Sequence, residues 1–203
     1  MRTHLHGRAC GQSRARPWVV VVVAFASAAG ASPAFIESTS ELDDGKPATA
    51  MWNLVDDSGA TVWCSQRQSA GNDLPFAVID LKSGQPVGAT RYMTIERGNR
   101  SLEIGGTWYG AAHRRTPVNT ESKYLLLGHA FDRLGCVRVQ FRTDLRNERS
   151  QKAIERLGAS REAVFRKHLR MPDGYQRSSV IYSLLDDEWP QVKVRLEKLL
   201  HEP

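Results

Sequence analysis

The chain has 203 residues, a length that suits one domain with a short additional segment. Hydrophobic residues make up 41% and charged residues 25%, which excludes collagen, a coiled-coil rod and a wholly disordered chain. The net charge is +6, and all of it lies after residue 72, because residues 1–72 carry six basic and six acidic side chains. This excess of positive charge suits an anionic partner, such as nucleic acid, an acidic protein or a phosphate-bearing cofactor. The alternative is a solvated basic surface without a specific partner.

The first residues differ in pattern from the rest. Arginines precede an apolar run over residues 18–25, and small residues follow, including Ala29-Gly30-Ala31. This order is typical of a secretory signal peptide, and the run is shorter than the roughly 20 apolar residues that span a membrane. Two other interpretations of residues 1–31 are a buried strand formed by the five valines and a mis-assigned start. Residues 32–73 show no steady period, so we expect an irregular segment there.

The cysteines and histidines do not predict a metal site. Cys10, Cys64 and Cys136 lack the spacing of metal ligands, and their odd number favours reduced thiols. The histidines between residues 113 and 168 likewise lack the spacing of a zinc site. We therefore expect no bound metal.

From residue 74 onward the chain alternates between strand and helix patterns. Period-two segments and turn residues predict strands, and a 3.6-residue period predicts helices. The expected strands are 76–81, 86–96, 102–109, 136–143, 164–171 and 176–185, and the expected helices are 119–134, 147–157 and one that begins after residue 187. This order predicts a mixed α/β domain over residues 74–203, with a twisted mixed sheet flanked by helices.

Apolar spacing and capping residues support the three helices. Tyr124, Leu127, Phe131 and Leu134 share one face of the first helix. The second begins at the N-cap candidate Asn147 and stops at Gly158. The inner stripe of the last helix is Trp189, Val192, Leu196 and Leu199.

The segment over residues 102–120 runs from a strand through a basic loop into a helix. A helix N-terminus offers unpaired N–H groups and partial positive charge, and Arg114 and Arg115 add full charges beside it. Thr116, Asn119 and Thr120 add polar donors, so the segment suits a phosphate or pyrophosphate. The simpler interpretation is helix capping with exposed arginines. Neither a P-loop nor a G-x-G-x-x-G sequence is present.

Three long runs of sequence resemble one protein family. The runs WYGAAHRRTPVNTESKYLLLGHAF, GCVRVQFRTDLRNERSQKAIERLGA and LRMPDGYQRSSVIYSLLDDEWPQVKVRLEKLL resemble GNAT N-acetyltransferases, especially the RimJ/RimL-like branch. The resemblance covers roughly residues 74–200 and implies the GNAT acyl-CoA N-acyltransferase fold with acetyl-CoA as co-substrate. The strand and two helices that begin the family's domain are not recognisable in residues 1–72.

The resemblance also assigns roles to residues. The pyrophosphate would be held by the loop and first turn, at Arg114, Arg115, Thr116, Val118, Asn119 and Thr120. The family signature Q/R-x-x-G-x-G/A is not matched here, and Pro117 supplies no N–H. Asn147 matches the asparagine that bonds the pantetheine arm. Ser150 matches a position that protonates the departing thiolate.

The strand before the loop carries the expected chemistry. Glu103 occupies a strand position where the family often has a glutamate, which predicts a general base for the acceptor amine; the alternative is a solvent-facing carboxylate. The backbone near Gly105, Thr107 and Trp108 would bind the acetyl carbonyl and pantetheine amides. Tyr182 is a second candidate acid, or a core tyrosine.

The resemblance implies acetyl transfer from acetyl-CoA to a primary amine, either a protein N-terminus or a small amine. One alternative is a domain that binds coenzyme A without catalysis. The other is a basic nucleic-acid-binding protein, which lacks the expected aromatic residues on a basic strand face. Because acetyl-CoA is cytoplasmic, we expect a cytoplasmic protein that is not in the membrane. A homodimer is expected from the resemblance alone.

Overall fold

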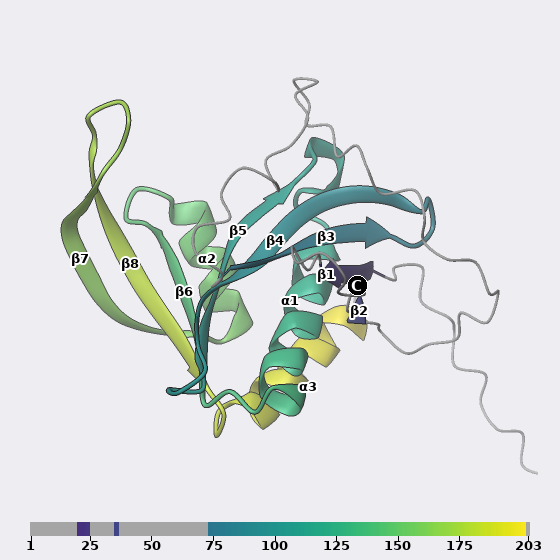
Figure 1. The fold of residues 1–203 in the computed structure, drawn as a ribbon. Coiled ribbons are helices and arrows are strands. Elements are labelled where there is room, and N and C mark those ends of the chain that lie inside the picture. Colours follow the sequence, from purple (N-terminus) through teal and green to yellow (C-terminus); the bar gives the residue numbers. More distant parts are fainter. Residues whose placement is uncertain (1–19, 25–34, 37–72, 202–203) are drawn as a thin grey trace, which may run out of the picture.

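The computed structural model describes residues 20–24, 35–36 and 73–201. Eight strands form one sheet in the order β2-β1-β3-β4-β5-β6-β8-β7, with helices packed on it (Figure 1). The strands are β1 (Val20–Ala24), β2 (Phe35–Ile36), β3 (Leu74–Asp80), β4 (Gln85–Glu96), β5 (Ser101–Tyr109), β6 (Arg138–Asp144), β7 (Ser160–Arg170) and β8 (Gln176–Leu185). The α-helices are α1 (Val118–Gly128), α2 (Glu148–Leu157) and α3 (Trp189–His201). The mixed α/β class expected from the sequence is confirmed.

Four of the five consecutive valines near the start of the chain, followed by Ala24, form strand β1. It pairs antiparallel with β3, with Val22 opposite Val78, and β2 pairs with its other edge. The backbone of this run therefore has the strand conformation that was one of three interpretations. The sequence Ala29-Gly30-Ala31, Cys10, Cys64 and most of the segment expected to be irregular lie outside the described residues.

The end of the first long helix differs from the expectation. After Gly128 the helix continues as a π-helical turn over His129–Arg133, in which the Leu134 N–H donates to the His129 carbonyl at 3.0 Å. A five-residue hydrogen-bond spacing rotates the following side chains away from the 3.6-residue stripe. Leu134, expected on the inner face, is consequently 53% exposed. Leu199, near the end of α3, is also exposed rather than part of the inner stripe.

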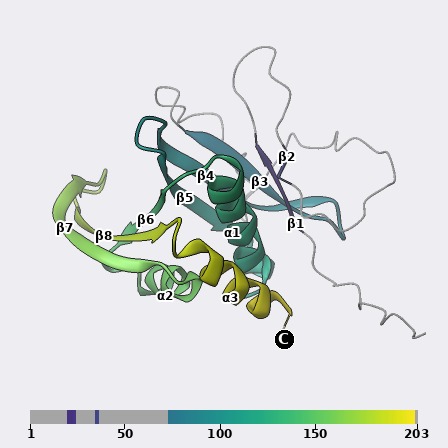
Figure 2. The same ribbon diagram turned by 90° about the horizontal axis from the view of Figure 1, so that it is seen from below.

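One hydrophobic cluster joins all three α-helices to the sheet. Helix α1 contributes Leu126 and Leu127, both fully buried, and the Tyr92 hydroxyl of β4 donates to the Leu126 carbonyl at 2.6 Å. Helix α3 lies beside α1, and its Trp189 indole donates to Asp132 at 2.8 Å (Figure 2). Burying such apolar surface is the main stabilising contribution to a fold of this kind.

Alternation along β6 separates this core from a polar face. Val139, Phe141 and Thr143 are buried, whereas Gln140 and Arg142 point to the opposite side and are only half-buried. Period-two alternation is expected when one face of a sheet is covered by helices. The polar face carries Glu103 of β5, so the fold presents this carboxylate away from the helices. Within the described residues, no helix is long and apolar enough to cross a membrane.

Candidate functional site

The sheet splits between its two central strands. β5 and β6 run parallel and pair over three residues each, Ser101–Glu103 with Arg138–Gln140. Beyond these residues β5 pairs with β4, and β6 pairs with β8, but among the described pairings they no longer pair with each other. Figure 1 shows the two strands diverging. The facing edges therefore offer backbone N–H and C=O groups to an extended molecule.

A β-bulge lies beside this split on β5. Arg91 of β4 pairs with Gly105 and Ala89 pairs with Trp108, so two residues of β5 oppose one residue of β4. Gly106 adopts φ +58°, and a Cβ there would lie 2.5 Å from Arg91 Nε, so this position requires glycine. The bulge lies within the residues expected to bind the pantetheine arm, and it bends the strand where its edge opens.

Glu103 lies at the closed end of the split. Its side chain is 4% exposed, and its Oε2 atom pairs with Arg142 at 3.2 Å and accepts a hydrogen bond from Gln140 at 3.2 Å. Both partners come from β6, so the carboxylate joins the strands where they separate. The expectation of a solvent-facing carboxylate is therefore wrong. Oε1 has no hydrogen-bond partner among the described residues, which leaves it available to accept a proton.

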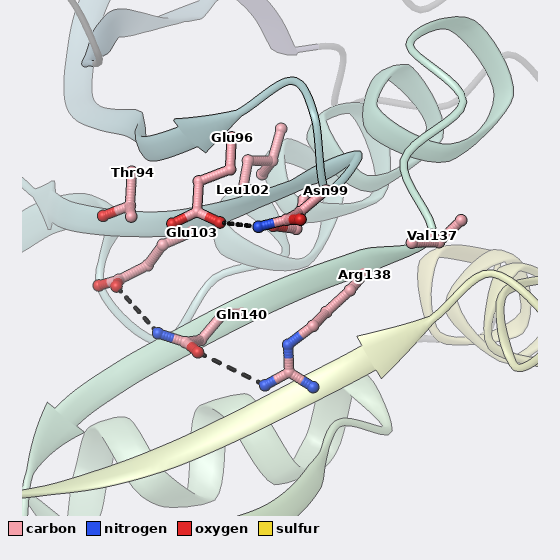
Figure 3. Close-up of a pocket in the computed structure, with 9 residues that line it drawn as sticks. Thr94, Glu96, Asn99, Leu102, Glu103, Val137, Arg138 and Gln140 are labelled. Atoms are coloured by element: carbon pink, nitrogen blue, oxygen red, sulfur yellow. Dashed lines mark hydrogen bonds between the residues drawn. The ribbon is translucent and has the colours of Figure 1, made fainter.

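A pocket of about 340 Å³ opens beside Glu103 on the polar face (Figure 3). It is lined by Thr94, Glu96, Asn99, Ser101, Leu102, Glu103, Val137, Arg138 and Gln140. The Arg138 guanidinium binds Glu162, and this bond holds the pKa of the Glu162 carboxyl down at about 2. Arg138 is thus paired with Glu162, and Glu103 is paired with Arg142. Glu96 is the lining carboxylate that forms no ion pair among the described residues, and its charge suits a cationic amine.

The basic loop and the start of α1 form a second part of the site. Pro117 is the N-cap residue, so the first turn has no side-chain cap. The N–H groups of Val118, Asn119 and Thr120 have no acceptor within residues 73–201. Such orphan donors at a helix N-terminus suit an anionic oxygen.

The loop side chains have local roles as well. The Arg114 Nε atom donates to the Tyr109 carbonyl at 3.0 Å, which places this guanidinium at the end of β5. Arg115 is exposed and adopts φ +64°, and the Thr116 hydroxyl donates to the His113 carbonyl at 2.8 Å. The predicted cationic residues therefore flank the helix start, while Thr116 shapes the loop.

A further cation at this position was missed by the sequence analysis. Arg156 of α2 donates from Nη2 to the hydroxyl of Thr120 at 3.1 Å. The Thr120 side chain is buried and accepts this bond, so Thr120 offers a ligand its backbone N–H. Because Arg156 reaches the first turn of α1 from another helix, only the tertiary structure reveals it.

The start of α2 is built as predicted. Asn147 caps the helix by accepting a hydrogen bond from the Ser150 N–H at 3.1 Å, and Gly158 ends it with φ +100°. The cap uses the amide oxygen of Asn147 and leaves its NH₂ group for a ligand. The Ser150 hydroxyl has no partner among the described residues. Both residues follow β6, across the split from β5.

Two tyrosines near the site are structural. The Tyr182 hydroxyl donates to Glu155 at 2.8 Å, and burial raises the pKa of Tyr182 to about 12. Tyr109 shares a hydrogen bond with Ser122 of α1, and burial raises the pKa of Tyr109 to about 12 as well. Neither group gives up a proton easily near neutral pH, which supports the core interpretation of Tyr182.

Helix α1 also buries a lysine beside the bulge. Lys123 is 5% exposed, and its Nζ atom donates to the hydroxyls of Thr90 at 3.0 Å and Thr107 at 2.6 Å. Burial lowers the pKa of Lys123 to about 7. The hydroxyl of Thr107, a predicted cofactor residue, is thus engaged by the helix. Within the described residues, no cluster of side chains suits a metal ion, and the Cys136 thiol is buried.

Comparisons with known proteins identify the family. The sequence model of the Acetyltransferase (GNAT) domain family matches residues 33–160. Among solved structures, a protein assigned as an acetyltransferase from T. thermophilus is 46% identical, with a TM-score of 0.60 over 65% of this chain and 68% of its own. A GCN5-related N-acetyltransferase from Brucella melitensis is 36% identical, with a TM-score of 0.61 over 64% of this chain and 58% of its own.

A more distant structure shares the fold. Mycobacterium smegmatis RimJ in complex with CoA-disulfide is 24% identical, with a TM-score of 0.57 over 64% of this chain and 61% of its own. The chain thus spans about two thirds or less of the length of most of these solved relatives. No curated protein sequence matches the chain.

Proposed function

The chain belongs to the GNAT acetyltransferase family, and from that premise we propose that it transfers an acetyl group from acetyl-CoA to a primary amine. The observation that carries this proposal is the split between β5 and β6, with the buried Glu103 at its closed end. A split of this kind gives an acyl-pantetheine arm a strand edge to pair with. It also places a carboxylate where the edge begins.

The described residues divide the binding of acetyl-CoA between two regions. The open edge of β5 near Gly105 and Trp108 would pair with the amides of the pantetheine arm. The orphan N–H groups of α1 would hold the pyrophosphate, and Arg114, Arg115 and Arg156 would supply its countercharges. Asn147 would bond the arm from the other side of the split through its NH₂ group.

Glu103 is the proposed general base. An amine is mostly protonated near neutral pH and must lose a proton before it attacks the thioester carbon. The Oε1 atom of Glu103 would accept that proton directly or through water, while Arg142 and Gln140 hold Oε2 in place. Collapse of the tetrahedral adduct breaks the C–S bond, and the nitrogen of the adduct loses its second proton. Ser150 is the proposed group that donates a proton to the departing CoA sulfur and regains one from the solvent or from that nitrogen.

The pocket beside Glu103 is the proposed site of the acceptor. The carboxylate of Glu96 and the hydroxyl and amide groups of the lining suit a polar, positively charged molecule. A protein N-terminus and a small amine both have that chemistry, and we propose these two classes as the acceptors to screen. The RimJ/RimL-like branch and a homodimer are parts of the same proposal that rest on sequence resemblance, and a cytoplasmic location is a part that rests on the use of cytoplasmic acetyl-CoA.

The test separates binding from chemistry. Glu103→Gln keeps the size of the side chain and its bond from Gln140, but it removes the base. We expect the Kd for acetyl-CoA, measured by calorimetry, to stay within about twofold, and kcat with a saturating primary amine to fall about 100-fold or more. An unchanged kcat would refute the role of Glu103.

The same experiment addresses the alternative of a non-catalytic binding domain. If the wild-type chain binds acetyl-CoA but acetylates no member of a panel of peptide N-termini and small amines, the domain binds without catalysis. If folded wild-type protein binds no acetyl-CoA, the proposed function is wrong. Salt-sensitive retention on DNA together with absence of acetyl-CoA binding would favour the nucleic-acid alternative.

A further inference from the structure

Lys123 is a buried basic group that takes no part in the proposed catalytic steps, and a hydrophobic core does not require its amino group. It lies in the second turn of α1 and faces the sheet, where it is 5% exposed. Among residues 73–201 no carboxylate forms an ion pair with it. Lysine is almost never buried this deeply without a partner charge.

Among the described residues, the amino group of Lys123 donates its hydrogen bonds to side chains at the bulge in β5. Nζ donates to Thr107 on the bulged strand at 2.6 Å and to Thr90 on the opposing strand at 3.0 Å. The two threonine hydroxyls lie 3.0 Å apart, and that of Thr90 also reaches the Gly105 carbonyl at 3.4 Å. One side chain of α1 therefore joins both strands at the point where β5 bends.

Stability does not explain this arrangement. Taking a basic amino group out of water is costly, and hydrogen bonds to two hydroxyls offset only part of the cost. An apolar side chain of similar length would pack at this position without that cost. A local departure from core composition of this kind is typical of a functional position.

We propose that Lys123 is a positioning residue for acetyl-CoA. Lys123 holds the bulge at Gly105–Thr107 and thereby sets the direction of the open edge of β5. The inference rests on the proposed function, because it assigns the open edge to the pantetheine arm. It adds a residue that touches no part of that substrate and acts through Thr107 and Thr90.

The position of Lys123 on α1 gives it a second consequence. Asn119, whose N–H belongs to the proposed pyrophosphate site, is one helical turn before Lys123. The same helix thus offers N–H groups to one end of the substrate and fixes the strand that holds the other end. Lys123 therefore sets the spacing between the pyrophosphate site and the pantetheine edge.

The primary test compares two ligands on the full-length chain. Lys123→Met keeps the aliphatic stem and removes the amino group, and Lys198→Met on α3 removes an exposed lysine as the matched control. Calorimetry with acetyl-CoA is expected to show a Kd about tenfold higher for Lys123→Met and unchanged for the control. The Kd for 3′-phospho-ADP, which lacks the pantetheine arm, is expected to be unchanged in both variants.

A second pair of variants guards against loss of folding in Lys123→Met. Thr107→Val removes the hydroxyl that Lys123 binds, and Thr107→Ser retains it. We expect Thr107→Val to raise the Kd for acetyl-CoA and Thr107→Ser to restore it. The double variant Lys123→Met/Thr107→Val should show no further loss of affinity for acetyl-CoA beyond either single variant, because the two residues act as one unit.

The outcomes distinguish the two proposals. If the wild type, folded Lys123→Met and Thr107→Val all bind acetyl-CoA with the same Kd, the proposed role of Lys123 is wrong and the proposed function stands. An equal loss for acetyl-CoA and 3′-phospho-ADP would also overturn it, since that result indicates general damage. Absence of acetyl-CoA binding by folded wild-type protein would refute both.

Discussion

The buried lysine of α1 makes a prediction about stability that does not depend on any substrate. Burial lowers the pKa of Lys123 from 10.5 to about 7. Between these two values the unfolded chain holds a proton that the native protein has released. The free energy of unfolding therefore rises with pH across this window. The difference between 10.5 and about 7 corresponds to about 5 kcal/mol in total, or about 1.4 kcal/mol for each pH unit.

Urea unfolding of the wild type and Lys123→Met from pH 6 to pH 10 measures this contribution. Burial also raises the pKa of Tyr92, Tyr109 and Cys136, which lowers stability at the alkaline end. These groups are present in both proteins, so their effect cancels in the difference between the two unfolding free energies. We expect the advantage of Lys123→Met to be largest below pH 7 and to shrink by about 1.4 kcal/mol per pH unit above it. A difference that stays constant across this range would refute the reasoning.

Four other variants test the remaining parts of the site. Replacing Arg114 and Arg115 together with Ala should raise the Kd for acetyl-CoA about tenfold or more in calorimetry, because it removes two countercharges of the pyrophosphate. Arg156→Ala should act in the same direction with a smaller change, and an unaltered Kd would remove this residue from the site. Gly106→Ala should lower the free energy of unfolding by about 1–2 kcal/mol in urea titrations, since φ is positive there. Asn147→Ala should cost about 1 kcal/mol by the same measurement through loss of the cap of α2, and an unchanged stability would contradict the role of its side chain.

The sequence predicted the elements whose signals are local. Asn147 and Gly158 bound α2 as expected, because capping depends on residues a few positions apart. The hairpin strand Gln176–Leu185 has the predicted bounds, and its period-two pattern needs no long-range information. The π-helical turn after Gly128 was missed, since a change of hydrogen-bond spacing leaves no distinct pattern in the apolar residues.

The site was predictable only in part, because its missed residues depend on contacts between distant segments. Lys123 follows four polar residues, so the sequence is typical of an exposed helix start, yet its side chain on α1 faces Thr107 of β5. Arg156 has no local feature that indicates its bond to Thr120. The sequence offered a solvent-facing carboxylate as one interpretation of Glu103, but the side chain is buried and contacts Arg142 and Gln140, which a neighbouring strand supplies.

The three residue pairs that join β5 to β6 have a consequence for the mechanics of the domain. They are the only described strand pairing that connects the half-sheet β1–β5 to the half-sheet β6–β8. A bound molecule can pair with the open edge of β5 and also contact β6 or α2. It then acts as a temporary additional strand between the two half-sheets. Its binding energy then adds to the stability of the whole fold, and the gain grows with the logarithm of its concentration. Amide hydrogens along β5 beyond Glu103 should therefore exchange more slowly when the ligand is bound, in step with a higher melting temperature.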